Sequence, residues 1–247
     1  MKIAVCINYV PDTASKIKLT DDNRIDENGL SYVINPFDEF AIEEALKTKE
    51  KFGGEIFAIS AGNDAKKEGI KKALAMGVDN GILLKYDGYM DPFNIADNLA
   101  AQIKTLGSNI VFFGRQSVDY DNGITGLLTA ELLNYNCISI VTKLDIQGNE
   151  VTAEREIEGG KEVVKSTLPI VITTQKGLNE PRYATLKGIM ASKKKVIEEI
   201  NITSVSNLVE NVSYKLPKVK NPGRILGSDA SAVNELVKLL RDEAKII

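Results

Sequence analysis

Apolar runs alternate with amphipathic stretches over the first 146 residues of the chain. The apolar runs span residues 2–8, 55–60, 81–86, 109–114 and 137–144. Each reads as a strand that is covered on both faces. Between the runs, apolar residues recur every three or four positions, as they do on one face of a helix. The alternation predicts β-α-β crossovers and therefore an α/β fold with a mainly parallel, twisted sheet flanked by helices.

Capping signals set the expected ends of the helices. Asn35-Pro36 and Asp91-Pro92 each offer a capping side chain followed by proline at the first helical position. Asp64 can cap the helix between these two, and Gly53-Gly54 ends the first one. For Asn35 the spacing alone favours a plain helix cap.

Two segments depart from the alternation. Residues 16–34 alternate polar and apolar positions around Asp-Asp and Asn-Gly, which predicts an inserted β-hairpin. Residues 150–174 hold three strand-like pieces, which predicts a mostly antiparallel extension whose last strand returns to the main sheet.

The last fifty residues carry a weaker pattern. Residues 219–224 resemble a linker, and residues 230–244 form an amphipathic helix. Such a helix can pack on its own sheet or on a partner, and the sequence leaves both open. We place a nucleotide-binding α/β domain at 1–200 and a C-terminal arm at 201–247.

Composition excludes several kinds of chemistry. The 247 residues include no histidine and two cysteines, so a Ser-His-Asp triad, a Cys-His dyad and a zinc site made by this chain alone are not expected. The formal net charge is −3, with 31 basic and 34 acidic residues, which gives no reason to expect nucleic acid as a partner. No apolar run approaches the roughly 20 residues that span a bilayer. We expect a cytoplasmic protein, or one of an organelle matrix.

The most informative loop, residues 114–126, follows an apolar strand and precedes a helix. In an open α/β sheet, ligands bind at the carboxyl ends of the strands, where free N–H groups at a helix start attract phosphate. Gly123 and Gly126 allow close approach, and Asn122 and Thr125 can cap the helix or bind phosphate oxygens. Two acids, Asp119 and Asp121, favour a nucleotide with a ribose over free phosphate. A capped loop without a ligand is the alternative.

Two later segments carry charge and apolar residues together. Leu186, Ile189 and Met190 share one face of a short predicted helix, beside a run of lysines at 193–195. This is either a docking surface for an acidic partner or an ordinary amphipathic helix with solvated lysines. The alternating charges of residues 154–158 are typical of a protected strand edge.

The chain resembles the β subunit of electron transfer flavoprotein (ETF) over almost its whole length. The motifs that carry the resemblance are NPFDEFAIEEALK (35–47), KALAMGVDNG (72–81), GRQSVDYDNGITG (114–126), EREIEGGKEVVKSTLPIVITT (154–174) and LNEPRYATLKGIM (178–190). The resemblance implies a fold of the adenine-nucleotide α-hydrolase or Rossmann type. It also implies an αβ heterodimer that takes electrons from acyl-CoA or related dehydrogenases and passes them to ETF:quinone oxidoreductase, without being an enzyme or inserting into the membrane itself.

The resemblance further implies two nucleotides. FAD lies mainly in the α subunit, with Phe37 near the flavin, whereas a second aromatic of some relatives is replaced by Thr13. AMP with a structural role lies in β. Its expected contacts are Cys6, Asn35, Pro36, Phe37, Asp38, Ala61, Gly114, Arg115, Gln116, Ser117, Val118, Asp119, Tyr120, Asp121, Asn122, Gly123, Ile124 and Thr125.

Partner contacts are implied as well. Leu186 matches the anchor of a recognition segment near 178–195, with Ile189 and Met190 beside it. Lys194 matches a modified lysine, and Glu156 an acid that pairs with an arginine of the α subunit. The C-terminal arm and helix are expected to pack on that subunit.

Two other functions stay open. In bifurcating relatives, a second FAD replaces AMP and exchanges hydride with NADH. Those relatives tend to have a Gln-Val-Gly-Pro-like run where this chain has Ile124-Thr125-Gly126-Leu127, which favours AMP here. A stand-alone nucleotide sensor is the third possibility.

Overall fold

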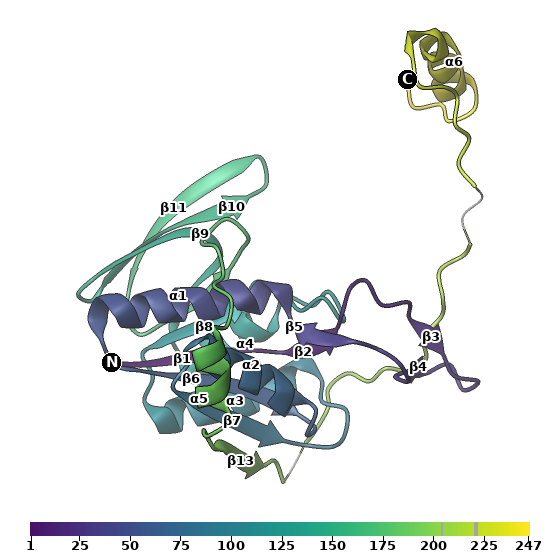
Figure 1. The fold of residues 1–247 in the computed structure, drawn as a ribbon. Helices are drawn as coiled ribbons and strands as arrows, with labels where there is room; N and C mark the ends of the chain where they lie inside the picture. The colour runs from purple at the N-terminus through teal and green to yellow at the C-terminus, as the bar shows by residue number, and fades with distance from the viewer. Residues whose placement is uncertain (204, 220–221) are drawn as a thin grey trace.

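The computed structural model describes residues 1–203, 205–219 and 222–247. One nine-stranded sheet forms its centre, in the order β11-β10-β9-β12-β8-β1-β6-β7-β13 (Figure 1). The strands of this sheet are β1 (Lys2–Cys6), β6 (Glu55–Gly62), β7 (Asn80–Lys85), β8 (Ile110–Gly114), β9 (Asn136–Gln147), β10 (Glu150–Ile157), β11 (Gly160–Thr167), β12 (Ile170–Thr174) and β13 (Ile197–Asn201). The seven strands from β9 to β13 in the sheet order pair in parallel, which confirms the predicted fold class.

Helices cover both faces of the sheet. They are α1 (Pro36–Phe52), α2 (Lys66–Met76), α3 (Pro92–Leu106) and α4 (Thr125–Leu133). Two further helices follow, α5 (Leu186–Ser192) beside α2 and α6 (Val233–Asp242) near the C-terminus, with a short 3₁₀ turn η1 (Ala230–Ala232) before α6. Alternate side chains of β1 serve the two faces: Ile3 and Val5 join a core with α1 and α2, while Ala4 and Cys6 join a second core with α3 and α4. The period of two along the strand explains why both faces need apolar residues.

The order of strands reverses beside β1. From β1 the chain goes to β6 and β7 on one side, and then returns to β8 on the other side. Such a switch point leaves a crevice at the carboxyl ends of the two strands, because their connections diverge to opposite sides. The predicted site loops follow these same strand ends.

Both predicted insertions are present. Residues 9–34 form two short antiparallel ladders, β2 (Tyr9–Pro11) with β5 (Tyr32–Ile34) and β3 (Lys18–Leu19) with β4 (Ile25–Asp26). Strands β9, β10 and β11 form the antiparallel extension, and β12 returns between β8 and β9 as predicted. The charged residues 154–157 lie in β10, which is flanked on both sides, so the interpretation as a strand edge is wrong; the edge is β11.

Two of the three expected caps are absent. Asp91 accepts a hydrogen bond from the backbone of Asn94 and caps α3 as predicted. Asn35 makes no capping bond with its side chain, although Pro36 begins α1 and Gly53 ends it. Helix α2 begins after Ala65, and the side chain of Asp64 is engaged by lysines instead.

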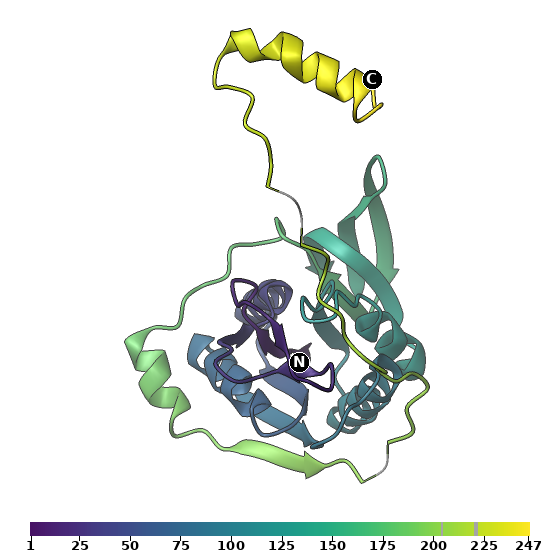
Figure 2. The same ribbon diagram turned by 90° about the vertical axis from the view of Figure 1, so that its right-hand side faces the viewer.

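Strand β13 and the arm occupy the end of the chain. The sequence pattern gave no sign of β13, which adds to β7 at the end of the sheet. Figures 1 and 2 show that α6 stands apart from the sheet, so the alternative in which it packs on its own sheet is wrong. The predicted linker at 219–224 includes two residues outside the described part of the chain. Among the described residues, no helix has the length and apolar character needed to cross a membrane.

Candidate functional site

A cavity of about 620 Å³ opens at the carboxyl ends of the central strands. It lies at the switch point, where Asn8 follows β1, Ala61 ends β6 and Gly114 ends β8. The expected contact residues that line it are Cys6, Asn35, Asp38, Ala61, Gly114, Arg115, Gln116, Ser117, Asp119, Tyr120, Asn122, Gly123 and Thr125. The remaining five, which flank these in sequence, are not part of its lining: Pro36, Phe37, Val118, Asp121 and Ile124. The fold therefore gathers segments that are far apart in the sequence.

Asp38 joins the ends of two parallel strands beneath the cavity. Its carboxylate accepts hydrogen bonds from the backbone N–H of Asn8 at 2.7 Å and from that of Gly114 at 3.1 Å. Burial raises the pKa of Asp38 to about 7, against the lowering effect of these two bonds. Burial likewise raises the pKa of the neighbouring Cys6 thiol, and the charge of Asp38 adds to this, which favours the protonated thiol.

Asn35 holds the loop between β8 and α4. Its side-chain amide donates to the carbonyl of Gln116 at 2.8 Å and accepts from the N–H of Val118 at 3.2 Å. It is 1% exposed, so these bonds satisfy a fully buried amide. The spacing favours a helix cap, but the Asn35 side chain bonds to the backbone of Gln116 and Val118 and makes no capping bond.

The loop itself is a closed turn. Ser117 and Asn122 exchange backbone hydrogen bonds, and the side chain of Asn8 donates to Ser117 at 2.9 Å and to Asp119 at 3.1 Å. Asp121 has a left-handed backbone with φ of 52° and pairs with the side chain of Gln116. Of the two acids, then, only Asp119 lines the cavity.

The start of α4 presents free backbone donors to the cavity. Asn122 accepts from the N–H of Ile124 at 3.0 Å, which closes a turn just before α4. The prediction that Asn122 caps the helix is wrong, because the N-cap residue is Ile124 and no side chain makes the capping bond. The first N–H groups of a helix have no acceptor within the helix. Thr125 and Gly126, which carry two of these groups, line the cavity. A Cβ on Gly126 would lie 3.0 Å from the side chain of Thr173, so only glycine brings this helix start so close to the sheet.

Two cations accompany these donors. Lys66 lies in the lining and donates to the side chain of Asn8 at 2.6 Å and to the carbonyl of Tyr9 at 2.9 Å. Burial lowers its pKa, and nearby carboxylates oppose that shift, Asp119 first among them. The guanidinium of Arg115 lies 5.6 Å from the centre of the Phe37 ring, a cation–π distance. An anionic ligand would therefore meet backbone donors and positive charge together.

Sequence reasoning missed part of the cavity. Lys66 carries no signal that sets it apart from the other lysines of α2, and residues 86–90 and 209–211 were not predicted to line a site. The first group follows β7, so the rule that ligands bind at strand ends would have found it. The second group comes from the arm, and no local signal indicates where an arm will lie.

A second candidate surface lies on α5. Thr185 caps this short helix by accepting from the N–H of Gly188 at 3.0 Å. A Cβ on Gly188 would lie 2.2 Å from the carbonyl of Ala75, so glycine permits α5 to rest closely on α2. Leu186 is 82% and Met190 68% exposed, with Ile189 partly exposed between them. The three predicted docking residues thus form an exposed apolar face, which we call the docking face.

The segment before α5 is clamped onto α1. Arg182 forms a fork with Glu43, with its Nε 2.8 Å from Oε2 and its Nη2 2.9 Å from Oε1. Glu43 is only 3% exposed, so the carboxylate of this pair is buried, while Arg182 stays partly exposed. Arg182 also pairs with Glu50 at 2.6 Å, and Asn179 donates to Glu44 at 2.9 Å.

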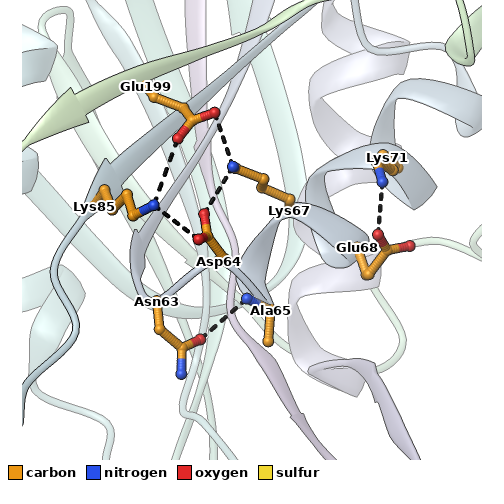
Figure 3. A network of polar contacts seen from close by, with 8 residues as sticks. All are labelled: Asn63, Asp64, Ala65, Lys67, Glu68, Lys71, Lys85 and Glu199. Carbon is orange, nitrogen blue, oxygen red and sulfur yellow. Dashed lines mark hydrogen bonds and ion pairs between the residues drawn. The ribbon is translucent and has the colours of Figure 1, made fainter.

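The segment after α5 is strand β13, which ion pairs tie to α2 and β7. Figure 3 shows Glu199 of β13 beside Lys67 and Lys85, which both also reach Asp64. Lys67 approaches Glu199 to 2.8 Å, and Lys85 approaches Asp64 to 2.7 Å. Hydrogen bonds from Lys67 and from Lys85 to Asp64 lower the pKa of this carboxyl to about 2, so it stays charged. The network fixes the strand that follows the docking face.

The lysine run is mixed rather than uniformly solvated. Lys193 and Lys194 are exposed, whereas Lys195 donates to the carbonyl of Val78 at 2.6 Å. Glu156, on the antiparallel extension, accepts from the side chain of Gln175 at 2.9 Å. It is partly exposed and lies on a different element from the docking face.

Comparison with known proteins covers the whole chain. A profile described as "Electron transfer flavoprotein domain" matches residues 22–205. The "Electron transfer flavoprotein subunit beta" of Bacillus subtilis is 38% identical, and the alignment covers 100% of both chains. The protein of the same name from Syntrophomonas wolfei is 34% identical over 100% of this chain and 98% of its own. That of Mus musculus is 35% identical over 100% and 99%.

Proposed function

Because this chain belongs to the electron transfer flavoprotein β-subunit family, we propose that it pairs with an α subunit and carries electrons from dehydrogenases to a quinone reductase. The donors we propose are acyl-CoA or related dehydrogenases, and the acceptor is ETF:quinone oxidoreductase. On this proposal the chain is a carrier subunit and not an enzyme. We expect it in the cytoplasm, or in the mitochondrial matrix if its source is eukaryotic.

The cavity at the switch point supports AMP as a resident ligand of this chain. The observation that carries the proposal is the union of an anion-binding helix start with a buried polar cradle. Thr125 and Gly126 offer backbone N–H groups, and Lys66 and Arg115 add positive charge. These groups suit the phosphate.

The other side of the cavity suits the nucleoside. Asp119 lines the cavity, and its carboxylate, which accepts from the side chain of Asn8 and from the N–H of Tyr120, can also accept from a ribose hydroxyl. Small or apolar residues, among them Ala61 and Gly62, leave room beside the strand ends for a planar base. The volume falls within the range of about 300–1,000 Å³ that is usual for small-molecule sites.

FAD is proposed to lie mainly in the α subunit. It would supply the electron-accepting and electron-donating chemistry. The contribution of this chain is to shape one wall of that site, with the half-buried Phe37 near the flavin. Glu156 would pair with an arginine of the α subunit.

The docking face is the proposed contact with the dehydrogenase. Leu186 would act as the anchor, since a large exposed apolar side chain at the start of a fixed helix can fill a pocket on a partner. The exposed Lys193 and Lys194 would steer an acidic partner toward it. Modification of Lys194 would reduce that steering.

One feature of the cavity favours the alternative in which this chain is the β subunit of a bifurcating flavoprotein. The cavity extends past the AMP contacts toward Tyr86, Ile95 and Leu99, which gives room for a ligand larger than AMP. In that case FAD would occupy this chain and oxidise NADH. Ile124-Thr125-Gly126-Leu127 favours AMP, and we keep AMP as the first choice.

Reduction by a dehydrogenase tests the proposal. The chain is purified with its α subunit, and flavin absorbance is followed after acyl-CoA and an acyl-CoA dehydrogenase are added. We expect bleaching of the flavin, and Leu186→Ala should slow it about tenfold or more without loss of flavin or AMP. Leu132→Ala, a change at an exposed leucine on α4, should leave the rate unchanged. Absence of reduction by any such dehydrogenase would refute the role, and loss of AMP from the Leu186 variant would refute the assignment of the docking face.

A further inference from the structure

Residues 206–214 cross the body before the arm departs from it, and we call this segment the strap. Figure 2 shows the arm running from the end of β13 across the molecule and then away toward α6. The strap has no regular secondary structure. Its position is therefore set by side chains at its two ends.

The first end of the strap is tied to the start of α3. Buried Asp91 accepts from the N–H groups of both Leu208 and Val209, at 2.5 and 3.0 Å. Asn94, one turn into α3, exchanges hydrogen bonds with the backbone of Ser206, at 2.8 and 3.0 Å. A residue that caps a helix thus also fixes where the arm begins.

The second end is tied to the N-terminal hairpin and to the loop at 114–126. Arg24 donates to the carbonyl of Asn211 at 2.9 Å, and the N–H of Tyr214 donates to the carbonyl of Asn23 at 3.0 Å. The hydroxyls of Tyr214 and Tyr120 are 3.1 Å apart. Tyr120 belongs to the proposed AMP-binding loop, so strap and loop contact each other directly.

Between its two ends the strap lines the cavity. Val209 and Asn211 are part of the lining, together with Tyr120 and Asp119 of the loop. The cradle formed by the strand ends therefore has an additional wall, supplied by a segment that lies outside the sheet.

This wall is held mostly by hydrogen bonds and not by apolar packing. Leu208 is 69%, Val209 62% and Val212 78% exposed. A second, polar hollow of about 650 Å³ lies along the strap, bounded by Arg24, Tyr89 and Tyr214. A segment with few buried apolar contacts can open locally at a small cost in free energy, so the strap is suited to act as a gate of the cavity.

We propose that the strap is a gating wall of the nucleotide cavity, and that its bonds from Tyr214 to Tyr120 and from Arg24 to Asn211 set how long AMP stays bound. The proposal rests on the AMP assignment made above. It adds residues that are distant in sequence from the AMP contacts and that touch the nucleotide-binding loop from outside the sheet.

The dissociation rate of AMP tests the gate. The αβ heterodimer is loaded with radiolabelled AMP and chased with unlabelled AMP, and the retained label is followed over time. Tyr214→Phe and Arg24→Met each remove one hydrogen bond, so each should speed release about two- to tenfold, and the double variant more. Tyr135→Phe is the matched control, because its hydroxyl donates to the carbonyl of Ser108 at 3.0 Å, before β8 and away from the cavity.

Each outcome separates the two proposals. Faster release from both strap variants, with control and wild type alike, supports the gate. If wild type retains AMP and the strap variants release it at the same rate, the gate is refuted while the AMP site stands. If wild type binds no AMP at all, both the AMP assignment and the proposed gate are refuted.

Discussion

Asp38 combines a positioning role with an unusual ionisation. Its carboxylate bridges Asn8, which follows β1, and Gly114, which ends β8; both residues line the cavity. Because burial raises its pKa from 3.8 to about 7, the folded chain binds a proton there that the unfolded chain releases near pH 4. Between those two values the folded state binds more protons, so this group lowers stability as the pH rises toward 7.

The pH dependence can be checked with Asp38→Asn, which cannot ionise. Urea unfolding of both chains between pH 5 and 8 gives the difference in unfolding free energy, variant minus wild type. We expect this difference to increase by on the order of 1 kcal/mol per pH unit up to about pH 7 and then to level off. A difference that stays constant across this range would show that Asp38 is already ionised at pH 5.

Gly126 tests the close approach of α4 to the sheet. Valine there would press against Thr173 and Phe113, which lie 3.0 and 3.2 Å from the position of a Cβ, and would push the helix start out of the cavity. We expect Gly126→Val to lower AMP retention after gel filtration and to reduce assembly with the α subunit. Gly223→Val, where a Cβ meets nothing within 4 Å, should leave AMP retention unchanged. Unchanged AMP content in the Gly126 variant would contradict this role of the helix start.

Single side chains mark the limit of prediction from this sequence. Asp91 was predicted as a cap and is one, but it also fixes the strap, which no spacing could show. Asn35 and Asp64 have the same capping signal and use their side chains elsewhere. A local motif states what a side chain can bind, and the fold decides which partner comes within reach.

At the scale of elements, the docking face is presented on a short helix with both flanks tied down. Arg182 clamps the segment before α5 onto α1, and the charges around Glu199 fix β13 after it. A helix of seven residues has little stability alone, so these tethers and its packing on α2 decide its orientation.

Arg182→Lys tests the clamp. Lysine keeps the charge but cannot form the two-pronged contact with Glu43, so the docking face should lose its fixed orientation. We expect the KM for the flavoprotein in the dehydrogenase assay to rise about fivefold, equivalent to roughly 1 kcal/mol, with kcat unchanged. Arg224→Lys changes an exposed pair with Glu235 and should have no effect. A fall in kcat at constant KM would contradict a role in docking alone.

The regular elements were largely predictable, and the irregular ones were not. Long apolar runs identified β1, β6, β7, β8 and β9, because a strand that is covered on both faces is apolar along its length. Residues 137–144 read as one even strand, yet Ile140 has φ of 61° and the register with β12 shifts there. Strand β13 was missed because it is short and lies at the end of the sheet, where two of its five residues are glutamates.

The whole molecule is a parallel sheet with appendages that extend away from it. The sheet holds the cavity at its switch point, while the extension, the docking face and α6 are offered at different places on the surface (Figures 1 and 2). Val233, Leu236 and Val237 leave one side of α6 apolar and exposed, which suits the proposed packing on the α subunit. On the proposed function, this arrangement would let the chain organise nucleotides and partners around chemistry supplied by a flavin.

The most direct test of the account is the nucleotide content of the purified αβ heterodimer. The complex is denatured, and the released nucleotides are identified and counted by mass spectrometry and absorbance against protein concentration. We expect one AMP and one FAD per heterodimer. Two FAD and no AMP would contradict it and assign the cavity of this chain to a second flavin.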